Sequence, residues 1–317
     1  MLKTPLENAV FSVSQVLRRL PLSAALVLLM TVDTATAEWM DWRGEIGLVL
    51  GDDDNVNIAA RGRDKRHDEF LDARARVSRR YALPEAKHSG AFLRVGADIA
   101  RSEYSEFDGL SGWRGGVWIG YQQKYGLGAL APRFTVRASA HYDKPDDQYR
   151  EHWEYRLLAA GTIPLTPRVT ATARGMAVQR SGRDWQSSNL QLSSSVFDQA
   201  RIELGGELRV RVQASTRFYF RADYLDGEFD AFCGPGTSER LEQVAGIPGV
   251  KAVALDQVFG SCRWLLDGDG WRYQAGAEFA MSPTQAVELS WEESDIRIDT
   301  GQSYERAVVR LAWRYAF

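Results

Sequence analysis

The closing stretch of the chain, "YERAVVRLAWRYAF" (Tyr304–Phe317), decides the fold class. From Ala307 to the terminal phenylalanine every second residue is apolar or aromatic, and Arg306, Arg310 and Arg314 are among the residues that alternate with them. This period of two predicts a β-strand whose successive side chains point to opposite faces. A face that finishes with Trp313, Tyr315 and Phe317 is typical of a strand in contact with lipid, because aromatic residues gather where the membrane meets water.

The composition is compatible with a membrane-spanning barrel. The 317 residues are 44% hydrophobic with a mean hydropathy of −0.33, and no stretch has the roughly 18 consecutive apolar residues of a transmembrane helix. A barrel strand needs apolar residues only at alternate positions, which keeps the mean hydropathy low. The net charge of −3 does not indicate a nucleic-acid partner.

The same alternation recurs along the chain, and the connectors between the alternating segments are short and long in turn. This order predicts an all-β, antiparallel, up-and-down transmembrane β-barrel with its tight turns at one end. The predicted strands number about twelve: 41–50, 69–83, 89–101, 113–125, 132–142, 150–162, 168–179, 199–213, 216–226, 270–281, 285–298 and 303–317.

Three segments qualify this prediction. Fourteen strands are the alternative if the long outer loop at 227–269 contains another strand. Segment 185–198 is assigned to an outer loop or to a strand extension above the membrane. In 285–298 the apolar side chains change face, which predicts a β-bulge near Glu292–Glu293.

The first 37 residues predict a secretory signal peptide, which leaves 38–317 as the barrel domain. Arg18 and Arg19 precede the apolar run Leu20–Val32, and Ala35-Thr36-Ala37 has the small-x-small pattern of a cleavage site. In an exported protein the two cysteines, Cys233 and Cys262, predict a disulfide.

The tail resembles the closing strand of Gram-negative outer-membrane β-barrel proteins. That resemblance implies a multi-pass barrel in the cell outer membrane, in contact with its lipid and lipopolysaccharide. It also implies that Trp313, Tyr315 and Phe317 form a signal for the barrel-assembly machinery. The stretch "GDDDNVN" (51–57) resembles the first hairpin of uncharacterised barrels associated with exopolysaccharide export. It is also similar to the barrel of surface lipoprotein assembly modifiers.

With the apolar face in lipid, the polar face of the strands lines the lumen. Guanidinium groups bind carboxylates and phosphates well. A lumen lined by arginines therefore indicates a channel or export conduit that favours anions, with an anionic solute or oligosaccharide as cargo. Arg209, Arg211, Arg217 and Arg221 are expected near the periplasmic mouth. The predicted lumen-lining residues are Arg74, Arg76, Arg94, Arg137, Arg156, Arg201, Arg209, Arg211, Arg217, Arg221, Arg272, Arg306, Arg310 and Arg314.

Other functions compete with the channel. Arginines and acids that pair across strands would form a structural network in a loop-plugged barrel for surface interaction or assembly, as an accessory of lipoprotein or exopolysaccharide export. An outer-membrane hydrolase is the third alternative, with Ser139 and His141, or His141, Asp143 and His152, as its candidate groups. No enzyme activity and no cofactor is expected.

A cation site in the first outer loop is a minor alternative. Hard cations bind several oxygens, and four oxygen-bearing side chains follow one another here. A solvated turn explains the same stretch, so no metal is expected as the main interpretation. The candidate ligands are Asp52, Asp53, Asp54 and Asn55.

Overall fold

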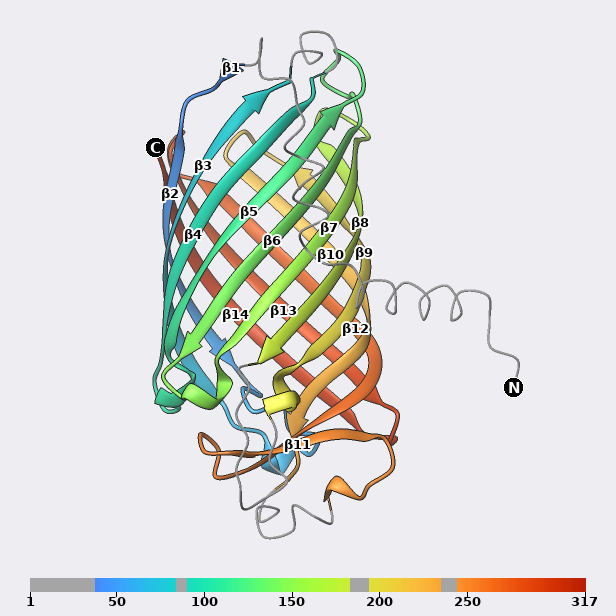
Figure 1. Ribbon diagram of the computed structural model, residues 1–317. Coiled ribbons are helices and arrows are strands. Elements are labelled where there is room, and N and C mark those ends of the chain that lie inside the picture. The colour runs from blue at the N-terminus through green and yellow to red at the C-terminus, as the bar shows by residue number, and fades with distance from the viewer. Residues whose placement is uncertain (1–37, 84–89, 183–193, 235–243) are drawn as a thin grey trace, which may run out of the picture. The chain divides into compact units, whose positions relative to one another are not determined.

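Twelve antiparallel strands close into a barrel in the computed structural model (Figure 1), which describes residues 38–83, 90–182, 194–234 and 244–317. The predicted signal peptide, residues 1–37, lies outside these residues. The wall strands are β2 (Arg43–Asp53), β3 (Asp68–Ala82), β4 (Phe92–Tyr104), β5 (Gly112–Lys124), β6 (Arg133–Pro145), β7 (His152–Pro164), β8 (Val169–Gly182), β9 (Gln199–Arg211), β10 (Thr216–Phe232), β12 (Ser261–Ala280), β13 (Gln285–Ile298) and β14 (Ser303–Ala316).

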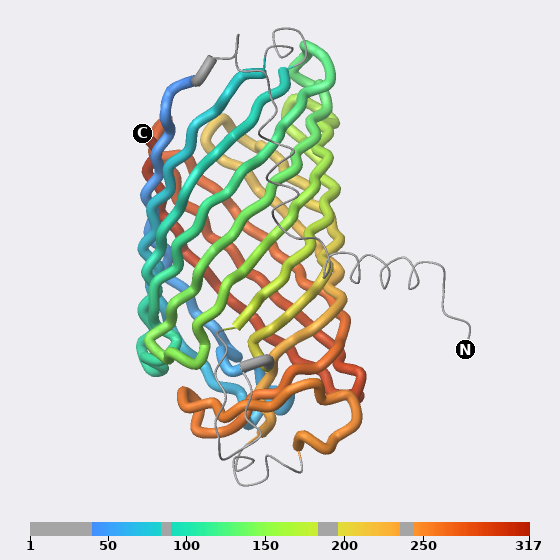
Figure 2. The backbone as a smooth tube through the Cα atoms, in the orientation of Figure 1, coloured from blue at the N-terminus to red at the C-terminus, as the bar shows by residue number. Residues whose placement is uncertain are grey.

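The predicted up-and-down topology is confirmed. Strands adjacent in the chain pair with each other, β10 pairs with β12, and β14 pairs with β2 to close the barrel. At this seam the Phe317 amide donates to the Gly44 carbonyl (3.0 Å) and the Gly44 amide donates to the Phe317 carbonyl (2.7 Å). Figure 2 shows the C-terminus beside the first wall strand, so the last residue completes the wall.

Two further strands lie outside the wall. β1 (Glu38–Trp39) precedes β2, and β11 (Val250–Asp256) pairs only with β12 among the described strands. The loop at 227–269 therefore does contain another strand, but the barrel keeps twelve. The segment predicted as a long outer loop also contains the ends of two wall strands, because β10 continues to Phe232 and β12 begins at Ser261.

The outer surface of the wall carries the apolar side chains. Exposed examples are Leu50 on β2, Val117 on β5 and Leu311 on β14. A barrel of this kind places such side chains in lipid, whereas a soluble barrel would turn them inward. No helix among the described residues is long and apolar enough to cross a membrane.

Aromatic pairs mark both edges of the apolar band. At the long-loop end, the ring centroids of Tyr142 and Trp153 are 5.1 Å apart, and those of Tyr224 and Trp271 are 5.4 Å apart. At the short-turn end the rings of Tyr315 and Phe317 stack at 6.0 Å. These girdles fix the two membrane interfaces, and bacterial barrels keep their short turns in the periplasm. We call the two ends of the barrel the outer end and the periplasmic end.

Candidate functional site

The barrel interior is the candidate site, and it carries the predicted arginines. All members of the predicted set lie at strand positions that alternate with the lipid-facing ones. Ten of them pair with carboxylates: Arg74, Arg156, Arg201, Arg209, Arg217, Arg221, Arg272, Arg306, Arg310 and Arg314.

Glu154 on β7 is the centre of one ion-pair network. Its carboxylate is fully buried and accepts from Arg114 (2.6 Å), Arg156 (2.5 Å) and Arg180 (2.8 Å). These arginines come from β5, β7 and β8, so one carboxylate joins three strands. A buried charge with this many partners is costly to leave unpaired, so the network ties the wall together.

A second network crosses β8, β9, β10 and β12. Asp223 binds Arg174 and Arg221 (both 2.7 Å), and Arg272 joins it at 3.3 Å. Arg272 also donates to Glu203 at 2.5 Å. Along most of this wall the positive charge is therefore neutralised, as the structural alternative predicts.

Five arginines on β2, β3, β4 and β6 differ from the paired ones. Among the described residues, Arg43, Arg76, Arg80, Arg94 and Arg137 have no carboxylate within ion-pair distance. Each lies in the half of its strand that is nearer the periplasmic end. The lumen thus has a positive sector toward the periplasmic end of β2, β3, β4 and β6, whereas Arg74 and Arg114 nearer the outer end of this side are paired.

The periplasmic mouth adds further arginines. A cavity of about 410 Å³ there is lined by the short-turn ends of β6 to β10 and by the β5–β6 and β7–β8 turns. Arg211, predicted at this mouth, donates to the Pro167 carbonyl at 2.5 Å. Arg209 and Arg217 also line it but are paired with Glu207 and Glu278, and Arg221 is not among its lining residues. The full lining set of arginines is Arg133, Arg168, Arg209, Arg211 and Arg217.

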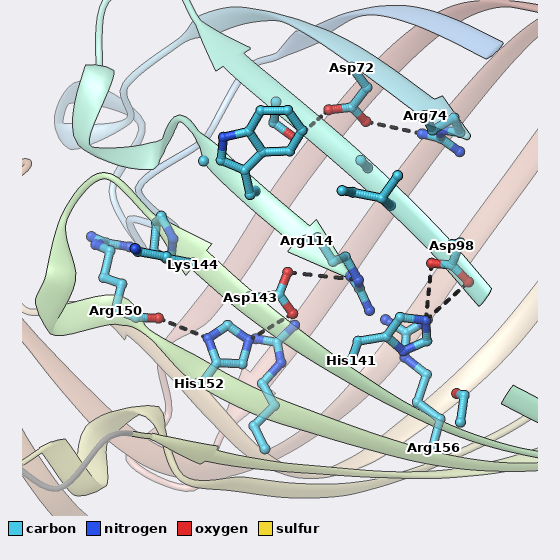
Figure 3. A pocket seen from close by; sticks show the side chains of 18 of the residues that line it. Asp72, Arg74, Asp98, Arg114, His141, Asp143, Lys144, Arg150, His152 and Arg156 are labelled. Carbon is cyan, nitrogen blue, oxygen red and sulfur yellow. Dashed lines mark hydrogen bonds and ion pairs between the residues drawn. The ribbon is translucent and has the colours of Figure 1, made fainter. Parts of the chain in front are cut away.

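A larger cavity of about 620 Å³ occupies the interior beside β3 to β8 (Figure 3). Its wall mixes both signs of charge. Asp143 faces Arg114 (3.7 Å) and His152 (3.5 Å), as the dashed lines in Figure 3 show. The cavity extends from the positive sector toward the outer end, so it is a continuous space inside the barrel.

The candidate hydrolase groups line this cavity, and of the second set Asp143 and His152 lie 3.5 Å apart. His141 Nε2 lies 3.3 Å from Asp98 Oδ2, and the two point toward each other in Figure 3. Within the described residues no hydrogen bond links Ser139 to His141, so the nucleophile and its base are not joined. The arrangement gives no support to acyl transfer.

The candidate cation ligands of the first loop point to four different partners. Asp53 is buried and binds Arg306, whereas Asp52 faces His67 at 2.8 Å. Asp54 accepts from the Ala307 amide, and the Asn55 side chain donates to backbone carbonyls. The four side chains do not converge, and the described residues contain no group of ligands that could hold a metal ion. In this arrangement Asp53, Asp54 and Asn55 fasten the loop to β14, which gives the cation-site alternative no support.

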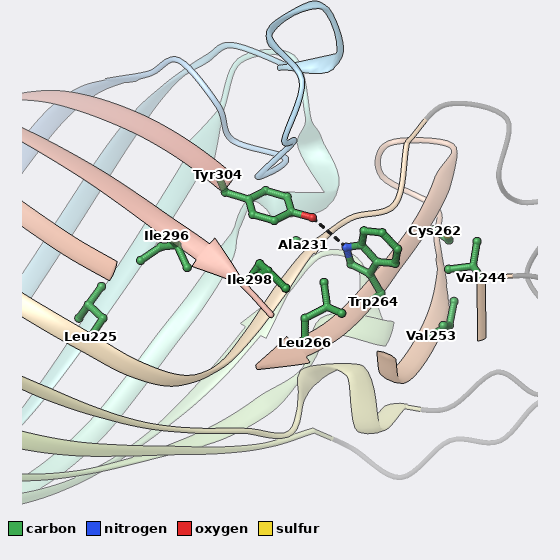
Figure 4. Packing of buried hydrophobic residues seen from close by; sticks show 10 residues of the cluster. All are labelled: Leu225, Ala231, Val244, Val253, Cys262, Trp264, Leu266, Ile296, Ile298 and Tyr304. Carbon is green, nitrogen blue, oxygen red and sulfur yellow. Dashed lines mark hydrogen bonds between the residues drawn. The ribbon is translucent and has the colours of Figure 1, made fainter. Parts of the chain in front are cut away.

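A cap covers part of the outer mouth. We define the cap as residues 227–234 and 244–269, the outer ends of β10 and β12 together with β11. Figure 4 shows its apolar core, in which Trp264 and Leu266 of β12 lie beside Tyr304 of β14, with a hydrogen bond from Trp264 to Tyr304 (3.2 Å). The predicted Cys233–Cys262 disulfide is confirmed and joins the two strands of the cap, with Cα atoms 5.4 Å apart.

The tip of the cap reaches the opposite loops. The rings of Phe259 and Phe107 are 4.8 Å apart, and Arg150 donates to both oxygens of Asp256 (2.7 and 2.8 Å). Inside the cap Arg263 is buried beside Asp230 and Asp256. Burial alone would raise the pKa of Asp230, but Arg263 and other nearby arginines hold it well below its usual range. The cap therefore continues from β10 and β12 at one side of the mouth and contacts the opposite loops at the other.

The cap also explains an error in the strand prediction. The register of β13 is continuous from Gln285 to Ile298, so the bulge predicted near Glu292–Glu293 was wrong. Ile296 and Ile298 stay on the inner face, where they are buried in the core of the cap. The inner face becomes apolar there because an apolar cap rather than water covers it.

The segment predicted as an outer loop at 185–198 lies partly outside the described residues. Its last part forms a short 3₁₀ helix, η4 (Ser194–Phe197), whose Val196 and Phe197 pack against Ala254 and Leu265 of the cap.

We expect the Cys233–Cys262 bridge to stabilise the folded protein. Closing a loop with a sequence separation of 29 residues should add about 3–4 kcal/mol on the chain-entropy model. Urea unfolding of a Cys233→Ser/Cys262→Ser variant, compared with wild type, measures the loss. Thiol labelling of the unreduced, denatured wild type should find neither cysteine. Labelling of both cysteines would contradict the bridge.

Sequence reasoning missed Trp118 of β5, which points into the lumen and is only 7% exposed. The Arg137 guanidinium lies 4.2 Å from its ring centroid, and that of Arg94 lies 5.9 Å away. The signal was present in the sequence. Trp118 shares a face with Gly116 and Gly120, and the neighbouring Val117 is on the opposite, lipid-facing side.

Comparisons with known proteins find similar barrels among solved structures. An outer-membrane channel of Pseudomonas putida F1 is 14% identical, with 90% of this chain and 100% of that chain covered and a TM-score of 0.48. The NanC porin is 8% identical (85% and 98% covered, TM-score 0.45). The DcaP channel of Acinetobacter baumannii is 10% identical (90% and 99% covered, TM-score 0.40). No family model and no curated protein matches the chain, so the resemblances to export-associated barrels stay predictions.

The class of protein follows from the geometry of the chain itself. A closed antiparallel barrel with an apolar outer band, two aromatic girdles and a charged interior is a β-barrel of the Gram-negative outer membrane.

Proposed function

We propose that the protein is an outer-membrane channel whose lumen favours anions. The observation that carries this proposal is the positive sector of Arg43, Arg76, Arg80, Arg94 and Arg137, which have no carboxylate partner within the described residues. Charges that are already paired contribute little field, whereas unpaired guanidinium groups in a narrow, low-dielectric wall attract anions and repel cations.

The periplasmic mouth supports the same direction of selectivity. Its cavity is lined by five arginines, of which only Arg209 and Arg217 have carboxylate partners within the described residues. An anion that enters from this end meets positive charge at the mouth and again in the positive sector. Screening weakens such a field at high salt, because the Debye length falls from about 10 Å at 0.1 M to about 3 Å at 1 M.

The ion selectivity of variants in planar bilayers tests this proposal. Arg94→Gln/Arg137→Gln removes two unpaired charges, so the reversal potential in a KCl gradient should move toward that of a non-selective pore. The matched control is Arg310→Gln/Glu292→Gln, which removes an ion pair (3.3 Å) and leaves the net charge unchanged. The control should keep the wild-type reversal potential. If the two variants behave alike, the positive sector does not set the selectivity.

One observation favours a second candidate function, a capped barrel that serves surface interaction or assembly. The cap reaches across the outer mouth and contacts the β4–β5 and β6–β7 loops through Phe259 and Asp256. A cap that never moves would block conduction, and the arginine pairs would then be structural. Conductance of the Cys233→Ser/Cys262→Ser variant compared with wild type separates the two candidates, since an open channel carries current in both proteins.

A further inference from the structure

Three arginines of the positive sector form one row across β3 to β6. In the strand register Arg80 lies opposite Arg94, Arg94 lies opposite Gly120, and Gly120 lies opposite Arg137. Directly opposite residues of an antiparallel pair have Cβ atoms about 4.5–5.5 Å apart, and like charges there repel each other. The fold thus concentrates positive charge in a row where an uncharged residue would be less costly.

Aromatic rings hold these guanidinium groups in place. Arg94 and Arg137 both lie over Trp118, and the Arg80 guanidinium lies 5.5 Å from the centroid of Phe92. Trp118 itself rests on the β4 backbone at Gly96, where an added Cβ would come within 2.5 Å of the indole ring. Cation–π contact orients an arginine without neutralising it, so the row keeps its positive charge.

The row contains hydrogen-bond donors that lack acceptors. Arg80 Nε, Arg94 Nε and Trp118 Nε1 are buried and have no hydrogen-bond partner in the part of the chain that the structure describes. Guanidinium and indole groups are donors only, so they cannot satisfy one another. The acids nearest in the register, Glu45 and Asp98, lie opposite Arg76 rather than in the row, and Asp98 is bound by His141.

We infer that Arg80, Arg94, Arg137 and Trp118, here called the arginine row, form a saturable binding site for a compact multivalent oxyanion. The ligand class is defined by chemistry that phosphate-type anions and di- or tricarboxylates share: several acceptor oxygens and more than one negative charge. Guanidinium forks match both kinds of group, and a multivalent anion would relieve the repulsion along the row. The inference depends on the proposed channel function in one respect, namely that the binding site lies in the conduction pathway.

Current block in planar bilayers tests the site. With KCl as the carrier salt, added pyrophosphate should produce blocking events whose frequency rises with concentration and saturates, whereas acetate at the same concentration should not. Citrate in a parallel arm shows whether carboxylates bind as phosphates do. A block by pyrophosphate or by citrate identifies the source of the oxyanion, and the absence of block by both overturns the site.

Variants of the row provide the specific readout. Arg94→Gln and Arg137→Gln should each weaken pyrophosphate binding about tenfold or more, because each removes a charge-assisted hydrogen-bonding group. Arg94→Lys, which keeps the charge, should retain part of the affinity and guards against a general folding defect. The ion-pair variant Arg310→Gln/Glu292→Gln should bind as wild type. Equal affinity in wild type and in both glutamine variants would overturn the assignment.

Calorimetric titration of the detergent-solubilised full chain with pyrophosphate separates this site from the channel function. Saturable heat that is lost in Arg94→Gln/Arg137→Gln supports the site even if no current flows, in which case the channel proposal alone fails. If the current is anion-selective but pyrophosphate produces neither saturable binding heat nor current block, the binding site is overturned and the channel proposal remains.

Discussion

Glu154→Gln is expected to destabilise the folded barrel by about 3–5 kcal/mol, because the buried carboxylate is the ion-pair partner that the partly buried Arg156 and Arg180 share. The side chain keeps its shape and loses only its charge, so the loss reports the network with Arg114, Arg156 and Arg180. Urea titration of the purified protein in lipid vesicles, followed by heat-modifiable electrophoretic mobility, gives the free energy of unfolding.

The matched control for this experiment is Glu207→Gln. Glu207 also faces the lumen and pairs with an arginine, Arg209, at 3.0 Å, but that arginine side chain is 43% exposed. A solvated pair contributes about 0–1 kcal/mol, so this variant should unfold close to wild type. Equal destabilisation by the two changes would contradict a wall held together by its buried networks.

The second large effect is expected in assembly. Phe317→Asp should reduce the amount of folded protein in the outer membrane severalfold in cells. Phe317 is exposed to lipid at the periplasmic edge, stacks on Tyr315 and lies against Gly44 across the seam. An acidic residue near the interface costs only about 0–1 kcal/mol in a folded barrel. A severalfold loss would therefore report recognition of the tail by the assembly machinery rather than instability.

Refolding without the machinery separates these two causes. Phe317→Asp protein that is purified unfolded should refold into lipid vesicles nearly as well as wild type, and Phe317→Tyr should assemble normally in cells. A normal yield of Phe317→Asp in the outer membrane would show that the terminal residue is no assembly signal. Equal losses in cells and in vesicles would show that its role is packing at the seam.

The wall of the barrel could be predicted from the sequence because a strand with one face in lipid alternates apolar and polar residues. In β14 the alternation of arginine with apolar residues assigns every side chain to one face, and the register then follows from antiparallel pairing. The same alternation places the arginines inside the barrel. It is a property of each strand alone and needs no knowledge of long-range contacts.

The pairing of those arginines could not be predicted. Arg272 of β12 binds Glu203 of β9, two strands away, because the strands tilt and bring distant register positions together inside the lumen. The cap was equally hidden. Beyond Tyr224 the residues of β10 that continue its apolar face are the acids Asp226, Glu228 and Asp230, so the alternation no longer indicates a strand. The change of face in β13 was interpreted as a β-bulge, because the apolar cap that buries Ile296 and Ile298 leaves no signal in the strand itself.

The reversal potential of the wild-type channel tests the central claim most directly. Purified full-length protein in a planar bilayer, under a KCl gradient at low total salt, should carry current with a reversal potential of the sign set by chloride. Raising the salt on both sides at a constant ratio should reduce this preference, because screening weakens the field of the unpaired arginines. A cation-selective reversal potential, or no current at all, would contradict the account.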